Sequence, residues 1–272
     1  MRHCQLRTIM ALLALSHFAA TAHPQKLEKA AAPPSERNAP SLALSPAVIM
    51  IKTKPGGSST HPLTITNLTY GKCRFVMEAF DVVVRDGTRV FVPAGETVGG
   101  IARSAIFNPP TVELSPGESA QVKVTLTVPP EPAVRAVAAI FHGQTALPGN
   151  GNLMVTGSLG TLITYSLSDK IAVRTGAPTV KPQTETSNLT VSEQLQNYGR
   201  EPVVTKGTLA ILKSSGELIG RVAIESHRLL PGEKFDTMVE YPHNIQRGRY
   251  RAMISFVHGG GVQSNSVEFQ VQ

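Results

Sequence analysis

The sequence predicts an all-β fold, and three observations lead to that prediction. Short runs of alternating apolar and polar residues fill the chain from about Leu42 to its last residues. Turn residues interrupt these runs roughly every 8–12 residues, which is the spacing of a β-sandwich. No segment shows the periodicity of an amphipathic helix. We therefore expect two tandem immunoglobulin-like β-sandwich domains that follow a cleaved signal peptide.

Residues 1–22 have the three parts of a secretory signal peptide. Arg2 and Arg7 make its start basic, Thr8–Ala20 is apolar, and Ala20-Thr-Ala is a small-residue cleavage site. The apolar run is too short to anchor the mature chain in a bilayer. We expect an exported protein, in the periplasm or at the cell surface, without an integral membrane segment. Residues 23–40 are rich in Ala, Pro and charge, and are expected to form a flexible linker.

Charge and cysteine content narrow the kinds of partner and site. The chain has a formal charge of +7, and the signal holds two arginines and no acid, which leaves +5 for the mature chain. These basic residues are scattered rather than concentrated on one segment, which argues against nucleic acid as a partner. Cys4 would leave with the signal, so Cys73 would have no disulfide partner. We expect Cys73 to be a buried, small apolar residue.

The first sandwich is expected over residues 41–175. Its clearest alternation lies in Ala120–Val128, and Asp86-Gly87 is a tight hairpin signal. The expected strands are Leu42–Ile51, Pro62–Thr66, Phe75–Val84, Arg89–Val92, Ala120–Val128, Ala136–Phe141, Leu153–Gly157 and Leu159–Leu167. The expected turns are Lys54-Pro-Gly-Gly, Asn67, Asp86-Gly87, Pro109-Pro110, Ser115-Pro-Gly, Pro129-Pro130 and Pro148-Gly-Asn-Gly.

An interdomain linker is expected at 176–183, where two prolines interrupt the strand pattern, and a second sandwich over 184–272. The strands expected there are Leu189–Leu195, Val203–Leu212, Leu218–Ile224, Phe235–Tyr241, Arg249–Val257 and Ser266–Val271. The two units share one motif, because Leu114-Ser-Pro-Gly-Glu in the first corresponds to Leu230-Pro-Gly-Glu in the second. In both, Pro fixes φ and Gly supplies the turn that leads into a strand. This shared motif supports two tandem domains with the same fold.

The chain carries no motif for catalysis. It has no G-x-S-x-G, H-E-x-x-H, C-x-x-C or P-loop, and its histidines have no metal-ligand spacing. We therefore predict a non-enzymatic protein, with no catalytic, cofactor-binding or metal-binding residues and no cofactor. Exported tandem sandwiches of this type bind other molecules more often than they catalyse reactions.

The first unit resembles the N-terminal domain of PapD-like periplasmic pilus-assembly chaperones. The resemblance lies in Leu44-Ser-Pro-Ala-Val-Ile, in the segment 107–118 that ends Leu-Ser-Pro-Gly-Glu, and in Gln121-Val-Lys-Val-Thr-Leu, and it covers about residues 42–173. It implies a protein that assists the assembly of pilus or other surface-protein subunits by β-strand addition. Related immunoglobulin-like domains of bacterial surface proteins share the same features.

One departure from that family concerns a basic pair. In the family, an Arg on the first strand and a Lys on the last strand of this domain bind a subunit's terminal carboxylate. Here the first strand reads Ser45-Pro-Ala-Val, and the position of the Lys is occupied by Thr164. The basic anchor therefore cannot be carried over to this chain.

The segment Leu159–Leu167 is the candidate for binding a partner strand. Five of its residues alternate on one side: Leu159, Thr161, Ile163, Tyr165 and Leu167. A free edge of this kind could pair with an extended partner through backbone hydrogen bonds. The other interpretation is an interior strand that is paired on both sides.

Two functions remain open at this point. The first is a protein-binding module whose partners are envelope or pilus protein subunits. The alternative is a cell-envelope scaffold or adhesion protein that binds wall polymer or a surface partner, which the missing basic anchor favours. The sequence leaves the oligomeric state open.

Overall fold

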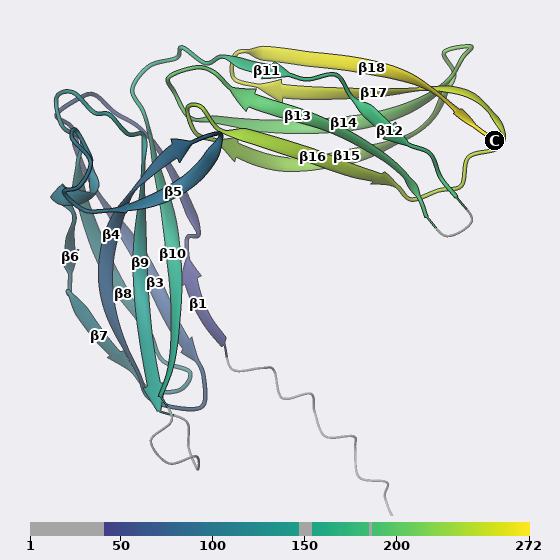
Figure 1. Cartoon of the computed structure of the whole chain (residues 1–272). Coiled ribbons are helices and arrows are strands. Elements are labelled where there is room, and N and C mark those ends of the chain that lie inside the picture. Colours follow the sequence, from purple (N-terminus) through teal and green to yellow (C-terminus); the bar gives the residue numbers. More distant parts are fainter. Residues whose placement is uncertain (1–40, 147–153, 185–186) are drawn as a thin grey trace, which may run out of the picture. The chain divides into compact units, whose positions relative to one another are not determined.

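The computed structural model describes residues 41–146, 154–184 and 187–272 (Figure 1). The expected signal peptide (1–22), the lead-in (23–40) and the turn at Pro148-Gly-Asn-Gly lie outside these residues. Within them the chain is built almost wholly of strands, with one short 3₁₀ turn at Ala102–Ser104. This part of the chain contains no helix that is long and apolar enough to cross a membrane. The prediction of two tandem immunoglobulin-like β-sandwiches is confirmed.

The first sandwich consists of a four-stranded sheet, ordered β1-β3-β8-β6, and a six-stranded sheet, ordered β2-β10-β9-β4-β5 with β7 also on β4. The strands are β1 (Ser41–Ser45), β2 (Val48–Lys52), β3 (Ser58–Leu68), β4 (Cys73–Arg85), β5 (Thr88–Pro93), β6 (Ile106–Asn108), β7 (Thr111–Leu114), β8 (Ser119–Thr127), β9 (Ala136–Ala146) and β10 (Met154–Ser166). Alternate residues of both sheets meet in one core, where Phe75, Phe141, Ile163 and Tyr165 are fully buried.

The structure corrects two strand predictions in this sandwich. The run Leu42–Ile51 was expected to be one strand, but it divides at Pro46 into β1, which pairs with β3, and β2, which pairs with β10. Proline has no backbone N–H to donate to a sheet, so a strand is readily interrupted there. The two strands expected at Leu153–Gly157 and Leu159–Leu167 are instead one continuous strand, β10.

The second sandwich consists of two four-stranded sheets. In one, β13 pairs with β16 and with the short strands β11 and β12, and the other is ordered β15-β14-β17-β18 (Figure 1). The strands are β11 (Val173–Thr175), β12 (Thr179–Lys181), β13 (Leu189–Asn197), β14 (Val203–Lys213), β15 (Leu218–Leu229), β16 (Lys234–Tyr241), β17 (Gly248–His258) and β18 (Gly261–Val271). Leu189, Leu195, Ile211 and Ile254 are fully buried in its core.

The expected linker at 176–183 does not match the hydrogen bonding of this region. Val173–Thr175 pairs with Leu195–Asn197, and Thr179–Lys181 pairs with Thr190–Ser192, so both segments are strands of the second sandwich. Strands this short carry no readable periodicity, and the prolines near them suggested a connector. The connection between the sandwiches is therefore residues 167–172, between the end of β10 at Ser166 and the start of β11 at Val173.

The shared Pro-Gly-Glu motif forms the same corner in both sandwiches. In the first, Asn67 N donates to Glu118 O at 3.0 Å and Gly117 N donates to Asn67 O at 2.7 Å. In the second, Asn197 N donates to Glu233 O at 3.0 Å and Gly232 N donates to Asn197 O at 2.8 Å. Gly117 and Gly232 have φ values of 79° and 83°, which favour glycine.

A buried asparagine is the centre of each corner. Nδ2 of Asn67 donates to Gly71 O and Leu114 O, at 2.8 and 2.9 Å. Nδ2 of Asn197 donates to Glu201 O and Leu229 O, at 2.8 and 3.1 Å. Both asparagines are fully buried. The expected turn at Asn67 is therefore wrong, since this residue belongs to β3 and its side chain holds the turn that follows.

A buried carboxyl group in the second sandwich leads to a prediction about pH. Glu193 is 3% exposed, and burial raises the pKa of its carboxyl, although Asn265 Nδ2 donates to it at 2.7 Å. The raised pKa means that the folded protein binds this proton more tightly than the unfolded chain does. The protonated Glu193 carboxyl therefore contributes fully to the free energy of unfolding below pH 4.5, which is the ordinary pKa of a glutamate. This contribution is lost as pH rises through the pKa of Glu193 in the folded protein.

We expect Glu193→Gln to remove this pH dependence and to raise the melting temperature at pH 7 above that of the unsubstituted protein. The amide keeps an acceptor for Asn265 and carries no charge to bury. Thermal melts followed by circular dichroism between pH 4.5 and 7.5 test this, with the exposed Glu240→Gln as the matched control. Equal pH dependence in Glu193→Gln and the unsubstituted chain would contradict the assignment.

Candidate strand-binding site

Strand β10 is bonded on both sides over only part of its length. It pairs with β9 from Met154 to Thr164, but with β2 only from Leu162 to Ser166. No described strand pairs with the second side of Met154–Gly160. We call this stretch the open edge of β10.

The direction of the backbone groups along the open edge follows from two hydrogen bonds further along the strand. Leu162 N donates to Ala47 O, away from β9, and Tyr165 N donates to Arg135 O, on the β9 side. Backbone groups alternate in direction along a strand, and the pairing with β9 runs without a register shift. Thr156, Ser158 and Gly160 therefore direct their N–H and C=O groups to the open edge.

Four of the five residues expected to bind a partner share one face of β10, and Leu167 follows the end of the strand. Most of the five are core residues. Thr161, Ile163 and Tyr165 are fully buried, Leu167 packs partly against the core, and only Leu159 lies in the open edge. Ile163 pairs with Ile49 on one side and Val137 on the other. From Leu162 onward the free-edge prediction is therefore wrong, and the interior-strand interpretation applies.

Two threonines fix β10 to its N-terminal neighbours, one to the turn between β1 and β2 and the other to β2 itself. Thr161 Oγ1 donates to Pro46 O at 2.7 Å, and Thr164 Oγ1 donates to Ile49 O at 3.0 Å. Thr164 is fully buried. The position compared with the family's lysine thus holds a neutral side chain whose hydroxyl is already used within the fold.

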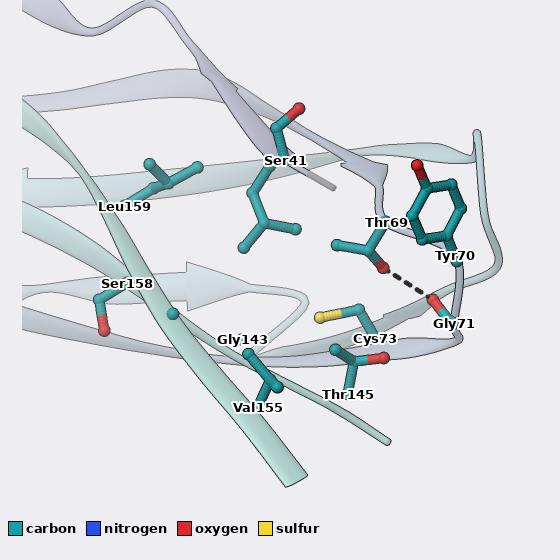
Figure 2. Close-up of a pocket in the computed structure, with 12 residues that line it drawn as sticks. Ser41, Thr69, Tyr70, Gly71, Cys73, Gly143, Thr145, Val155, Ser158 and Leu159 are labelled. Atoms are coloured by element: carbon teal, nitrogen blue, oxygen red, sulfur yellow. Dashed lines mark hydrogen bonds between the residues drawn. The ribbon is translucent and has the colours of Figure 1, made fainter. Parts of the chain in front are cut away.

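A cavity of about 290 Å³ lies beside the open edge (Figure 2). Twelve residues line it, and none of them has a carboxylate, ammonium, guanidinium or imidazole group. They come from β1 (Ser41, Leu42), the β3–β4 turn (Thr69, Tyr70, Gly71), β4 (Cys73), β9 (Gly143, Thr145) and β10 (Val155, Gly157, Ser158, Leu159). The cavity lies between β1, an edge strand of one sheet, and the part of β10 in the facing sheet that β2 does not cover.

The walls of the cavity are held firmly. Asn67 Oδ1 accepts from Thr69 N at 3.0 Å, and Thr69 Oγ1 donates to Gly71 O at 3.0 Å, the bond drawn in Figure 2. The corner described above therefore also fixes the turn that forms one wall. Gly143 forms another, because a Cβ there would lie 2.8 Å from the Phe75 ring and 3.1 Å from Cys73 Sγ.

Cys73 is 1% exposed, as expected for a small apolar residue. Burial raises the pKa of its thiol, so the sulfur facing the cavity is neutral at physiological pH. In the described residues, no three His, Cys, Asp or Glu side chains lie close enough together to hold a metal ion. The site offers backbone hydrogen bonds and an apolar cavity rather than reactive groups.

The cavity and the part of the open edge before Leu159 were missed from the sequence. One signal was present, since Gly157 lies inside a continuous strand, and an interior glycine often marks a close approach of another group. The strand predicted at Leu153–Gly157 instead ends at this glycine.

No family model matches this chain, and no curated protein matches its sequence. Solved structures with a similar fold include the class 5 fimbriae chaperone CfaA, at TM-score 0.42 and 15% identity, covering 85% of this chain and 99% of that one. The E. coli chaperone DraB has TM-score 0.38 and 14% identity, covering 86% and 98%. The CsuC–CsuE chaperone–tip adhesion subunit complex of Acinetobacter baumannii has TM-score 0.38 and 12% identity, covering 84% and 97%. At these identities and scores the likeness does not determine a function.

Proposed function

We propose that this chain is an exported, non-enzymatic protein-binding module that holds an extended segment of an envelope or pilus subunit on the open edge of β10. By β-strand addition it would keep that subunit from pairing elsewhere until the subunit is assembled. The observation that carries the proposal is the open edge of Met154–Gly160 beside an apolar cavity.

An exposed sheet edge leaves a protein open to unwanted pairing with other chains, unless the edge is used to bind a partner. It offers a row of free N–H and C=O groups on which another chain can pair, and soluble proteins usually cover or shorten such edges. Here β2 covers β10 only from Leu162 onward. A partner strand would continue the sheet along the open edge, so that backbone hydrogen bonds supply affinity and side-chain pockets supply selectivity.

The alternative function is a cell-envelope scaffold or adhesion protein. It is favoured by the lack of the basic anchor, since Thr164 is buried and bonded within the fold. A scaffold that bound wall polymer would not depend on the backbone of β10, and this difference separates the two functions.

Replacement of Thr156 by proline tests the open edge directly. We expect Thr156→Pro to fold and to capture at least about tenfold less subunit than the unsubstituted chain, because proline removes one N–H directed to the partner. The pairing of β10 with β9 does not use that N–H, and proline is tolerated on edge strands in this orientation. The measurement is co-purification with envelope subunits encoded beside the chain's own gene.

Thr156→Val is the matched control, since valine keeps the N–H and favours strands. It should capture subunits as the unsubstituted chain does. If Thr156→Pro melts normally and captures subunits at the unsubstituted level, the open edge is not the site and the scaffold function is favoured.

A further inference from the structure

We infer that the strand docking on β10 carries a large, uncharged apolar side chain that enters the cavity next to Gly157. This inference rests on the proposed function and adds the chemistry of the partner. The occupant is an extended protein segment with an aromatic or leucine-sized residue opposite Gly157.

The fold does not require glycine at position 157. Gly157 does not have a positive φ, unlike several other glycines of the chain. The nearest atom to an added Cβ would be Leu42 Cδ1 at 3.7 Å, which is an ordinary contact. A glycine inside a strand destabilises it relative to a residue with a side chain. Gly143 differs, because an added Cβ there would collide with Phe75.

Gly157 leaves a gap in an otherwise apolar row. The inward-facing residues of β10 around it are Val155 and Leu159, and both line the cavity with it (Figure 2). A side chain at 157 would point into the same space. The chain thus provides the two flanking apolar groups and leaves the middle position open.

The cavity has the size and polarity for a large apolar group. A cavity of about 150 Å³ is enough to hold benzene, and this one has a volume of about 290 Å³. None of the twelve lining side chains is an acid, an amine, a guanidinium or an imidazole, and the thiol of Cys73 is neutral. A charged side chain would lose its hydration there without gaining a partner.

A partner strand that pairs with the open edge would place one side chain at this gap. Residues directly opposite each other on paired strands place their side chains on the same face of the sheet. The face of β10 that bears Val155, Gly157 and Leu159 is the cavity face. The partner residue opposite Gly157 therefore points into the cavity, where glycine leaves room for it.

A set of strand peptides tests the inference. Fluorescein-labelled eleven-residue peptides of alternating Thr and Val would carry Phe, Leu, Ala or Asp at the central position. Fluorescence anisotropy would measure their binding to the mature protein. We expect the Phe and Leu peptides to bind at least about tenfold more tightly than the Ala peptide, and the Asp peptide to bind most weakly.

Gly157→Leu should remove this preference, because its side chain fills the cavity while the open edge remains. The Phe peptide should then bind no better than the Ala peptide. The Cβ added by Gly157→Ala fits without collision and fills less of the cavity than leucine does. This variant should therefore reduce the preference only in part. Thr156→Val is the control with an intact cavity and should keep it. A circular dichroism melt of each variant establishes that it is folded.

The outcomes separate the inference from the proposed function. If all peptides bind equally and Thr156→Pro abolishes the binding, strand addition stands and the inference is overturned. If the Phe peptide keeps its advantage in Gly157→Leu, the cavity is not its site and the inference is again overturned. If no peptide binds, both the inference and the proposed function fail.

Discussion

Ile163→Lys should unfold the first sandwich. Ile163 is fully buried in the core, and its strand is bonded on one side to β2 and on the other to β9. Lysine would lose the packing of a large apolar side chain, which costs about 2–5 kcal/mol. It would also bury an unpaired charge, which costs several kcal/mol more. The total approaches the whole stability of an ordinary domain, about 5–15 kcal/mol.

Val155→Lys is the matched control for this substitution. Val155 lies on the same face of the same strand, but it is 42% exposed at the open edge. A lysine there can extend its ammonium group into water. We expect Val155→Lys to keep the far-UV circular dichroism and melting curve of the unsubstituted chain, and Ile163→Lys to lose its cooperative transition. If Ile163→Lys melts like the unsubstituted chain, the position of β10 in the core is wrong.

Removal of the corner asparagines should have the next largest effect. Asn67→Ala removes the side-chain partner of the acceptor Leu114 O and of the donor Thr69 N, and one of the two donors to Gly71 O. A buried polar group left unsatisfied costs about 1–3 kcal/mol. We expect a loss of about 3 kcal/mol in the free energy of unfolding. Asn197→Ala should cost a similar amount, since it removes the partners of Glu201 O, Leu229 O and Gly199 N.

Hydrogen exchange followed by mass spectrometry locates each effect. Asn67→Ala should lower protection mainly in the first sandwich, and Asn197→Ala mainly in the second. Gln121→Ala, at an exposed position on β8, is the control and should change neither. Wild-type stability in Asn67→Ala would mean that the corner does not depend on its side chain.

Local features of the fold could be predicted because neighbouring residues determine them. The hairpin at Asp86-Gly87 is one example, since both residues have positive φ, 54° and 86°, in a turn that favours Asp and Gly. The repeated Pro-Gly-Glu corner is another. The short strands β6, β7, β11 and β12 were missed, because three or four residues are too few to show a period.

The candidate site could not be predicted in the same way. The alternation from Leu159 to Tyr165 does form one face of a strand, but the sequence does not show which strands lie beside it. The pairing of Leu162–Ser166 with β2 depends on contacts between distant parts of the chain. The open edge is the part of β10 that this pairing leaves free, so it becomes visible only in the folded structure.

The division of the N-terminal run at Pro46 affects the order in which the protein can fold. Thr161 and Pro46, which join β10 to this turn, are 115 positions apart in the sequence. Pairing over such separations pays a large loop-closure entropy before any contact is gained, and it slows folding. Among the described strands β2 pairs only with β10, so this pairing must wait until Leu162–Ser166 has been made. β2, which precedes most of the first sandwich in the chain, is thus among the last of its strands to be incorporated in the sheet.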